Sequence, residues 1–309
     1  MKTTKQYNLE IIAGPCSITL ENVNEIIDEI APITTPYGTR AIYGARVVGL
    51  KSRTALPSDG KGIGLDYSVI NEALSLSEKE RKKLLLPSLT LAEKIYKKTG
   101  MVIASEIMLP HIQLPFFERA KLNNHVMIWS PAVNQLGWNI LEMSNYAHRN
   151  KWHLGIKHAK FLGKDPLEVA NHPDYKDETS LEKTLLGLTT YAQKGKGDLI
   201  IIHRGVDVPG RGDFRNALIH EVMRRVKTHI PHAKLYFDPS HSYGPKLKDK
   251  IVDGIIEAMK LTHNNTFLYD GVLIEVGTSP SDTEQHITTK ELQELVNKLS
   301  TFRKLRSPK

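Results

Sequence analysis

The chain has 309 residues, 40% hydrophobic and 25% charged, which is an ordinary globular composition, and no apolar run is long enough to span a bilayer. Residues 1–6 are polar with no apolar segment after them, and Cys16 is the single cysteine, so we expect a soluble cytoplasmic protein without a signal peptide or disulfide framework. The net charge is +8, but the most basic stretch, residues 298–309, has only Phe302 as an aromatic, whereas nucleic-acid surfaces combine basic and aromatic residues. We therefore expect neither a nucleic-acid nor a membrane partner.

Strand-like runs alternate with helix-like segments along the chain. The strand candidates, short and rich in β-branched or aliphatic residues, are residues 9–13, 40–43, 101–104, 126–129, 153–156, 199–202, 234–237 and 271–274. Helix candidates with a 3.6-residue period include residues 20–30, 86–98, 181–193, 216–228 and 290–302. Residues 56–83 are long and polar and predict an extended loop, a candidate lid.

Eight such alternations predict one α/β domain over residues 1–309, a (β/α)8 TIM barrel rather than an open doubly wound sheet. No Gly-x-Gly-x-x-Gly motif follows a strand, which speaks against a dinucleotide-binding fold. In a barrel the chemistry is expected where the strands end.

Polar or charged residues follow seven of the eight predicted strands. In chain order they are Cys16, Arg46 with Lys51 and Arg53, Glu106, Lys157, Arg204, His241 and Glu275. Each has an ordinary structural explanation: a buried apolar thiol for Cys16, a turn cap for His241, an ion pair for Glu275. Together they favour a site, because charges at converging buried strand ends need partners.

These residues fall into two sets, one suited to bind a metal and one suited to bind anions. Cys16, His241 and Glu275 combine a thiol, an imidazole and a carboxylate, which suit a divalent ion such as Mn, Fe, Co or Zn. The cations that predict a cradle for phosphate and carboxylate are Arg46, Lys51, Lys157 and Arg204. His203, next to Arg204, is a candidate for a supporting position beside the site.

Seven short motifs occur in the order of a known enzyme family. Residues 11–17, Ile-Ile-Ala-Gly-Pro-Cys-Ser, resemble the opening signature of the 3-deoxy-arabino-heptulosonate 7-phosphate (DAHP) synthases and of the related 3-deoxy-manno-octulosonate 8-phosphate synthases. Arg46 and, five residues later, Lys51-Ser52-Arg53-Thr54 resemble the Lys-Pro-Arg-Thr of DAHP synthases. The other motifs are Ser105-Glu106, Gly155-Ile156-Lys157, His203-Arg204-Gly205, Asp238-Pro239-Ser240-His241 and Ile274-Glu275-Val276. The resemblance runs from about residue 9 to about residue 300.

This resemblance implies a metal-dependent condensation of phosphoenolpyruvate with a phosphorylated aldose, which opens the shikimate pathway to the aromatic amino acids. The implied metal ligands are Cys16, His241 and Glu275. The implied contacts of phosphoenolpyruvate are Arg46, Lys51, Lys157 and Arg204. Arg53 and Thr54 would meet the aldose phosphate, Glu106 would orient the attacking water, and Lys51 would give a proton to the aldehyde oxygen. By analogy with the family we expect a homo-oligomer, a dimer or tetramer.

Three departures leave the aldose open. Residues Ser130-Pro131-Ala132-Val133 stand where DAHP synthases have Gly-Ala-Arg, and they are closer to the octulosonate enzymes' Pro-Ala-Phe. The run Lys157-His158-Ala159-Lys160-Phe161-Leu162 also resembles the octulosonate pattern. The fourth ligand in short-spaced relatives is an Asp eleven residues beyond the Glu, and that position here is His286.

The leading expectation is therefore a DAHP synthase, because the Lys-Ser-Arg-Thr and Asp-Pro-Ser-His motifs favour erythrose 4-phosphate. The second is an octulosonate-type or specialised sugar-acid synthase acting on another aldose phosphate. The third, a barrel that only binds a phosphorylated ligand, is disfavoured by the complete set of chemical residues. His286 is either a fourth metal ligand or a surface loop residue, with Asp282 and Glu284 nearby.

Overall fold

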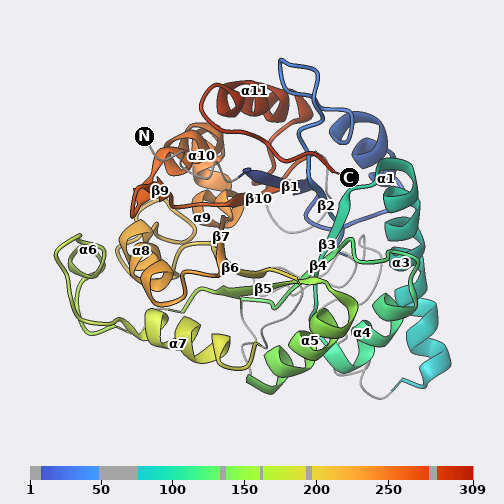
Figure 1. Ribbon diagram of the computed structural model, residues 1–309, viewed down its shortest axis with the longest axis horizontal. Helices are drawn as coiled ribbons and strands as arrows, with labels where there is room; N and C mark the ends of the chain where they lie inside the picture. The colour runs from blue at the N-terminus through green and yellow to red at the C-terminus, as the bar shows by residue number, and fades with distance from the viewer. Residues whose placement is uncertain are drawn as a thin grey trace.

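Eight parallel strands close into a barrel at the centre of the molecule, with helices around it (Figure 1). The computed structural model describes residues 8–48, 76–132, 137–160, 163–192, 197–277 and 284–308. In order around the barrel the strands are β1 (Glu10–Gly14), β10 (Gly271–Glu275), β7 (Lys234–Phe237), β6 (Leu199–His203), β5 (His153–His158), β4 (Val126–Trp129), β3 (Val102–Glu106) and β2 (Gly44–Arg46). The predicted (β/α)8 barrel is confirmed.

Helices connect the strands on the outside of this ring. The longer ones are α3 (Glu78–Thr99), α4 (Pro110–Arg119), α5 (Gly137–Asn150), α7 (Ser180–Thr189), α8 (His220–His229), α10 (Ile251–Lys260) and α11 (Thr289–Ser300). The short ones are α1 (Val23–Glu25), α6 (Leu167–Ala170), α9 (Pro239–Tyr243), the π-helix η1 (Ile26–Ile30) and the 3-10 helix η3 (Pro245–Lys250). A small antiparallel pair, β8 (Thr262–His263) and β9 (Thr266–Phe267), precedes β10.

Several predicted boundaries were wrong. The helix predicted over residues 181–193 ends at Thr189, and the one predicted over residues 20–30 begins at Val23 and continues as a π-helix. For three others a local contact gives the reason. Helix α3 starts at Glu78 inside the predicted loop 56–83, because Ser77 and Glu80 form a capping box. Helix α8 starts at His220 instead of residue 216, because Val206 and Ala217 pair as a β-bridge. The second strand lies at Gly44–Arg46 instead of residues 40–43, since that is where it pairs with β1 and β3.

The core consists of two layers separated by the strands. One layer fills the barrel, and its buried members are Ile12, Tyr43, Val48, Val102, Ala104, Met127, Trp129, Ile200, Ile202, Tyr236 and Leu273. The other layer packs the outer face of the strands against the helices. Strands buried on both faces explain why the sequence shows continuous apolar runs instead of alternation.

Two arginines after α11 make contacts within the fold. Arg303 is 4% exposed, and its guanidinium donates to the carbonyl oxygens of Met259 and Tyr269. Arg306 pairs with the buried carboxylate of Glu10 at the amino-terminal end of the barrel. Within the described ranges, no helix combines the length and apolar character needed to cross a membrane.

Candidate active site

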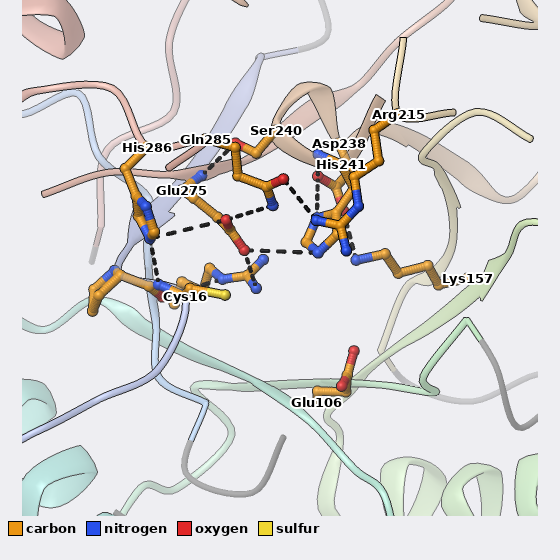
Figure 2. Close-up of polar contacts among 12 residues, drawn as sticks. Cys16, Glu106, Lys157, Arg215, Asp238, Ser240, His241, Glu275, Gln285 and His286 are labelled. Carbon is orange, nitrogen blue, oxygen red and sulfur yellow. Dashed lines mark hydrogen bonds and ion pairs between the residues drawn. The ribbon is translucent and has the colours of Figure 1, made fainter. Parts of the chain in front are cut away.

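The carboxyl ends of the parallel strands bring most of the predicted site residues together (Figure 2). Glu275, the last residue of β10, is in register with Gly14 of β1, two residues before Cys16. Gly14 permits a close approach there, because a side-chain carbon at this position would lie 2.7 Å from the backbone oxygen of Arg46. Strands β2 and β3 end at Arg46 and Glu106, and Lys157 is the penultimate residue of β5.

Glu275 is the central carboxylate and is fully buried. Its Oε1 atom lies 2.8 Å from a guanidinium nitrogen of Arg46 and 3.7 Å from Nε2 of His241. Its Oε2 atom accepts a hydrogen bond from Nε2 of Gln285 at 2.8 Å and lies 3.9 Å from Nε2 of His286. Its backbone N–H donates to Oγ of Ser240 at 3.0 Å. The carboxylate is thus held from both sides.

Cys16, Glu275 and His286 form a compact donor cluster, with ligand atoms all within 4.8 Å of one another. His286 reaches it because Ile287, the next residue, pairs with Val276 just beyond β10. The backbone N–H of Cys16 donates to Nε2 of His286 at 3.2 Å, so this nitrogen is unprotonated and its lone pair is directed toward Cys16. The structure therefore places His286 beside Cys16 and Glu275 and not on the surface, with 7% of the residue exposed.

His241 stands next to this cluster and is oriented by Asp238. Its Nδ1 atom lies 2.9 Å from the Asp238 carboxylate, whose pKa is lowered: burial raises it, but His241 and Lys157 outweigh burial. The ionised carboxylate accepts, so Nδ1 carries the proton. Burial lowers the pKa of His241 to about 3, so the ring is neutral near pH 7 and Nε2 carries a lone pair.

These donor atoms suit a divalent transition metal. The Cys16 thiol, the Glu275 carboxylate and an imidazole nitrogen of His286 lie within 4.8 Å of one another, and Nε2 of His241 lies 3.7 Å from the same carboxylate. Such groups bind Mn, Fe, Co or Zn. Oε1 of Glu275 and Nε2 of His241 are both electron-pair donors and lie 3.7 Å apart, a separation that a shared cation would stabilise. The residues present therefore fit the divalent ion that the sequence implies.

Buried cations lie beside the donor cluster. Lys157, 1% exposed, is 2.5 Å from Asp238. Burial lowers its pKa and Asp238 opposes this, while the charges of Arg204 and Arg46 lower it further. Burial also lowers the pKa of Arg46, but Glu275 and Cys16 outweigh it and raise the pKa overall. Three predicted cradle residues are thus within electrostatic reach of one another.

Glu106 faces the same space from the other side (Figure 2). Its Oε2 atom accepts a hydrogen bond from Nε1 of Trp129 at 3.2 Å, and 9% of the residue is exposed. The Trp129 ring also lies under the Arg46 guanidinium, 5.7 Å from centroid to carbon. Lys51, Arg53 and Thr54 lie outside the described residues.

Several functional neighbours were not predicted from the sequence. Asp238 belongs to a motif that we noted, but its bridging of Lys157 and His241 was not foreseen. Gln285 and Arg215 lie on different loops and meet only in the folded chain. The one sequence signal for Gln285 is its place directly before His286, at the predicted position of the fourth ligand.

His203 points away from the site. Its Nε2 atom accepts from the backbone N–H of Ile219 at 3.4 Å, so Nδ1 carries the proton and donates to the Tyr269 hydroxyl at 2.6 Å. Tyr269 in turn donates to Nδ1 of His220 at 2.7 Å. His203 therefore belongs to a hydrogen-bonded series with Tyr269 and His220, which is the kind of supporting position expected for it next to Arg204.

We expect the buried His220 in this hydrogen-bonded series to make the stability of the protein depend on pH. Burial lowers the pKa of His220 from 6.5 to about 4, so the unfolded chain binds more protons between these values and stability falls as pH drops through them. His220→Asn keeps an acceptor near the Nδ1 position but cannot be protonated, and it should lose less stability between pH 7 and pH 4, by up to roughly 3 kcal/mol. Urea unfolding across this range measures the effect. His229→Asn, exposed on the same helix, is the control, and equal pH slopes for all three proteins would contradict the prediction.

No protein family model matches the chain, and no curated protein matches it. Among solved structures, it is similar to the crystal structure of phospho-2-dehydro-3-deoxyheptonate aldolase (DAHP synthase) from Thermotoga maritima, with a TM-score of 0.61 and 19% identity. The similarity covers 96% of this chain and 68% of the Thermotoga chain. This chain has the fold of a DAHP synthase. At this identity the likeness establishes the fold alone, and the activity must be argued from the site.

Proposed function

We propose that this protein condenses phosphoenolpyruvate with erythrose 4-phosphate and releases DAHP and phosphate. The observation that carries the proposal is the position of Glu275, which lies between metal-type donors and the buried Arg46. A site with both a cation-binding cluster and buried cations suits a substrate with both a carbonyl and anionic groups. The likeness of fold to a DAHP synthase supports the same chemistry.

The divalent ion would be held by Cys16, His241, Glu275 and His286, and it would supply Lewis acidity toward the aldehyde oxygen of the aldose. Asp238 fixes the His241 ring so that Nε2 faces Glu275. At the position where short-spaced relatives have an Asp, His286 would offer a neutral imidazole as a ligand. The site would then be less negative, and its preference would shift away from Mg²⁺.

The buried cations would bind phosphoenolpyruvate. Arg46, Lys157 and Arg204 offer more positive charge than one carboxylate needs, which suits a ligand with a carboxylate and a phosphate. Lys157 is held by Asp238, and Arg46 by Glu275, so both are oriented before substrate arrives. Their charge would stabilise the departing phosphate.

The bond-forming steps need two proton movements. The enol carbon of phosphoenolpyruvate forms a bond to the aldehyde carbon, and the aldehyde oxygen takes a proton, which the family resemblance assigns to Lys51. Water then adds at the phosphate-bearing carbon and phosphate leaves. Glu106, oriented by Trp129, is placed to accept the proton of that water.

One observation favours a different aldose phosphate. Residues 130–132 carry no cation where the heptulosonate enzymes have an Arg, and Ser130 instead accepts from the backbone N–H of Lys157 at 3.5 Å. This segment resembles the octulosonate enzymes. An octulosonate-type synthase is therefore the second candidate.

An acceptor screen separates the candidates. With phosphoenolpyruvate and a divalent ion present, we expect phosphate release to be fastest with erythrose 4-phosphate, at least about tenfold above arabinose 5-phosphate in kcat/KM, a difference of about 1.4 kcal/mol. Arg53→Ala should chiefly raise KM for the aldose phosphate. A higher efficiency with arabinose 5-phosphate would replace the first candidate by the second, and no phosphate release with any aldose phosphate would reject both.

A further inference from the structure

The carboxamide of Gln285 bridges Glu275 and a guanidinium from another loop (Figure 2). Its Nε2 atom lies 2.8 Å from Oε2 of Glu275, and its Oε1 atom accepts from Arg215 at 2.7 Å. Gln285 and Glu275 are both 0% exposed. Gln285 also directly precedes His286, a member of the donor cluster.

The orientation of the Gln285 amide follows from the hydrogen-bonding capacity of its two partners. A guanidinium can only donate hydrogen bonds, so the amide atom that faces Arg215 must be the oxygen. The NH₂ group therefore faces Glu275 and donates to its carboxylate. A flipped amide would place its oxygen against the carboxylate and its NH₂ against the guanidinium, and both contacts would be repulsive.

Arg215 is itself held against the helix that carries His241. Its backbone N–H donates to the carbonyl oxygen of Tyr243 at 3.3 Å. Gly244 has φ +70°, and a side-chain carbon there would lie 2.6 Å from Cβ of Arg215, so only glycine allows this contact. The neighbouring Asn216 donates from its side chain to the carbonyl oxygen of His241 at 2.5 Å. The guanidinium is thus positioned by the same segment that positions an imidazole donor.

We propose that Gln285 is a positioning residue for Glu275 and that Arg215 keeps the Gln285 amide from flipping. Both act on the metal site of the proposed function, on which this inference rests. The amide holds Oε2 of Glu275 while Oε1 faces Arg46 and His241. Partners of this kind typically change metal affinity by about 10- to 100-fold when they are removed.

The test is a Co²⁺ titration of metal-free protein in the absence of substrates. Gln285→Leu should weaken Co²⁺ binding by about 10- to 100-fold and alter the visible d–d spectrum, because the carboxylate loses its fixed orientation. Arg215→Met should weaken binding in the same direction, and Arg215→Lys, which keeps a donor, should recover part of the affinity. In the double variant the losses should be less than additive, because the two residues act through one chain.

Arg211→Met is the matched control, since Arg211 lies on the same loop and pairs with the exposed Asp207. Its affinity and spectrum should equal those of the wild type. The melting temperature of each metal-free variant reports folding, and if Gln285→Leu does not fold, Arg215→Met and Arg215→Lys carry the test. Wild-type affinity and spectrum in the folded variants, or no Co²⁺ binding by the wild type, would overturn the proposal. Because no aldose is present, failure of the acceptor screen leaves this result unaffected.

Discussion

Dialysis against a chelator is expected to abolish phosphate release from phosphoenolpyruvate and erythrose 4-phosphate, and added Mn²⁺, Fe²⁺, Co²⁺ or Zn²⁺ should restore it. Cys16→Ala should bind metal more than about 100-fold more weakly than the wild type. The loss should exceed that for a residue that only orients a ligand, because this variant removes a ligand itself. The physical reason is the donor cluster, whose ligand atoms lie within 4.8 Å of one another and include the only thiol of the chain.

Metal content and activity of the dialysed protein measure this prediction. Cys16 is 0% exposed, so a melting curve of metal-free Cys16→Ala must accompany the titration to separate lost affinity from lost folding. Full activity of metal-free wild-type protein would contradict the prediction, and it would point to metal-independent chemistry at the same strand ends.

Lys157→Met should lower kcat on phosphoenolpyruvate by at least about tenfold, the loss of one charge-assisted contact to a substrate anion. It should also lower stability, because the buried Asp238 carboxylate loses its charged partner at 2.5 Å and is left with the neutral His241 ring at 2.9 Å. Losing one partner of a buried ion pair typically costs about 3–5 kcal/mol.

Arg204→Ala separates the two effects, since Arg204 is less deeply buried than Lys157. Its kcat should fall by a similar factor while its melting temperature changes less. Lys260→Met, an exposed lysine at the end of α10, controls for the lost charge and should match the wild type in both measurements. Unchanged kcat in Lys157→Met and Arg204→Ala would remove both residues from the phosphoenolpyruvate contacts.

Much of the site could be predicted because a barrel converts sequence position into spatial position. Each of Cys16, Glu106 and Glu275 directly ends or follows an apolar run, and parallel strands bring such positions to one end. The same reasoning placed Lys157 and His241. His286 was harder, since it lies in a loop, and its place depends on the bridge between Val276 and Ile287.

Boundaries were less predictable than strand identity. The period of apolar residues marks where a helix is buried, but its first turn is set by a cap such as Ser77 with Glu80, which contributes nothing to the apolar pattern. In the same way, the apolar residues 41–43 resemble a strand, whereas the paired register with both neighbouring strands begins at Gly44.

By itself, the sequence determined the eight alternating units, the strand ends that carry chemical residues, and the thiol, imidazole and carboxylate available to a metal. These follow from short-range patterns: apolar runs form buried strands, and the residues after them must lie at the barrel's end. Only the tertiary structure decided which partners orient those groups. The ion pair between Lys157 and Asp238, and the hydrogen bonds that link Arg215 through Gln285 to Glu275, join residues from different strands and loops. Such contacts depend on side-chain direction and loop packing, which no local pattern encodes.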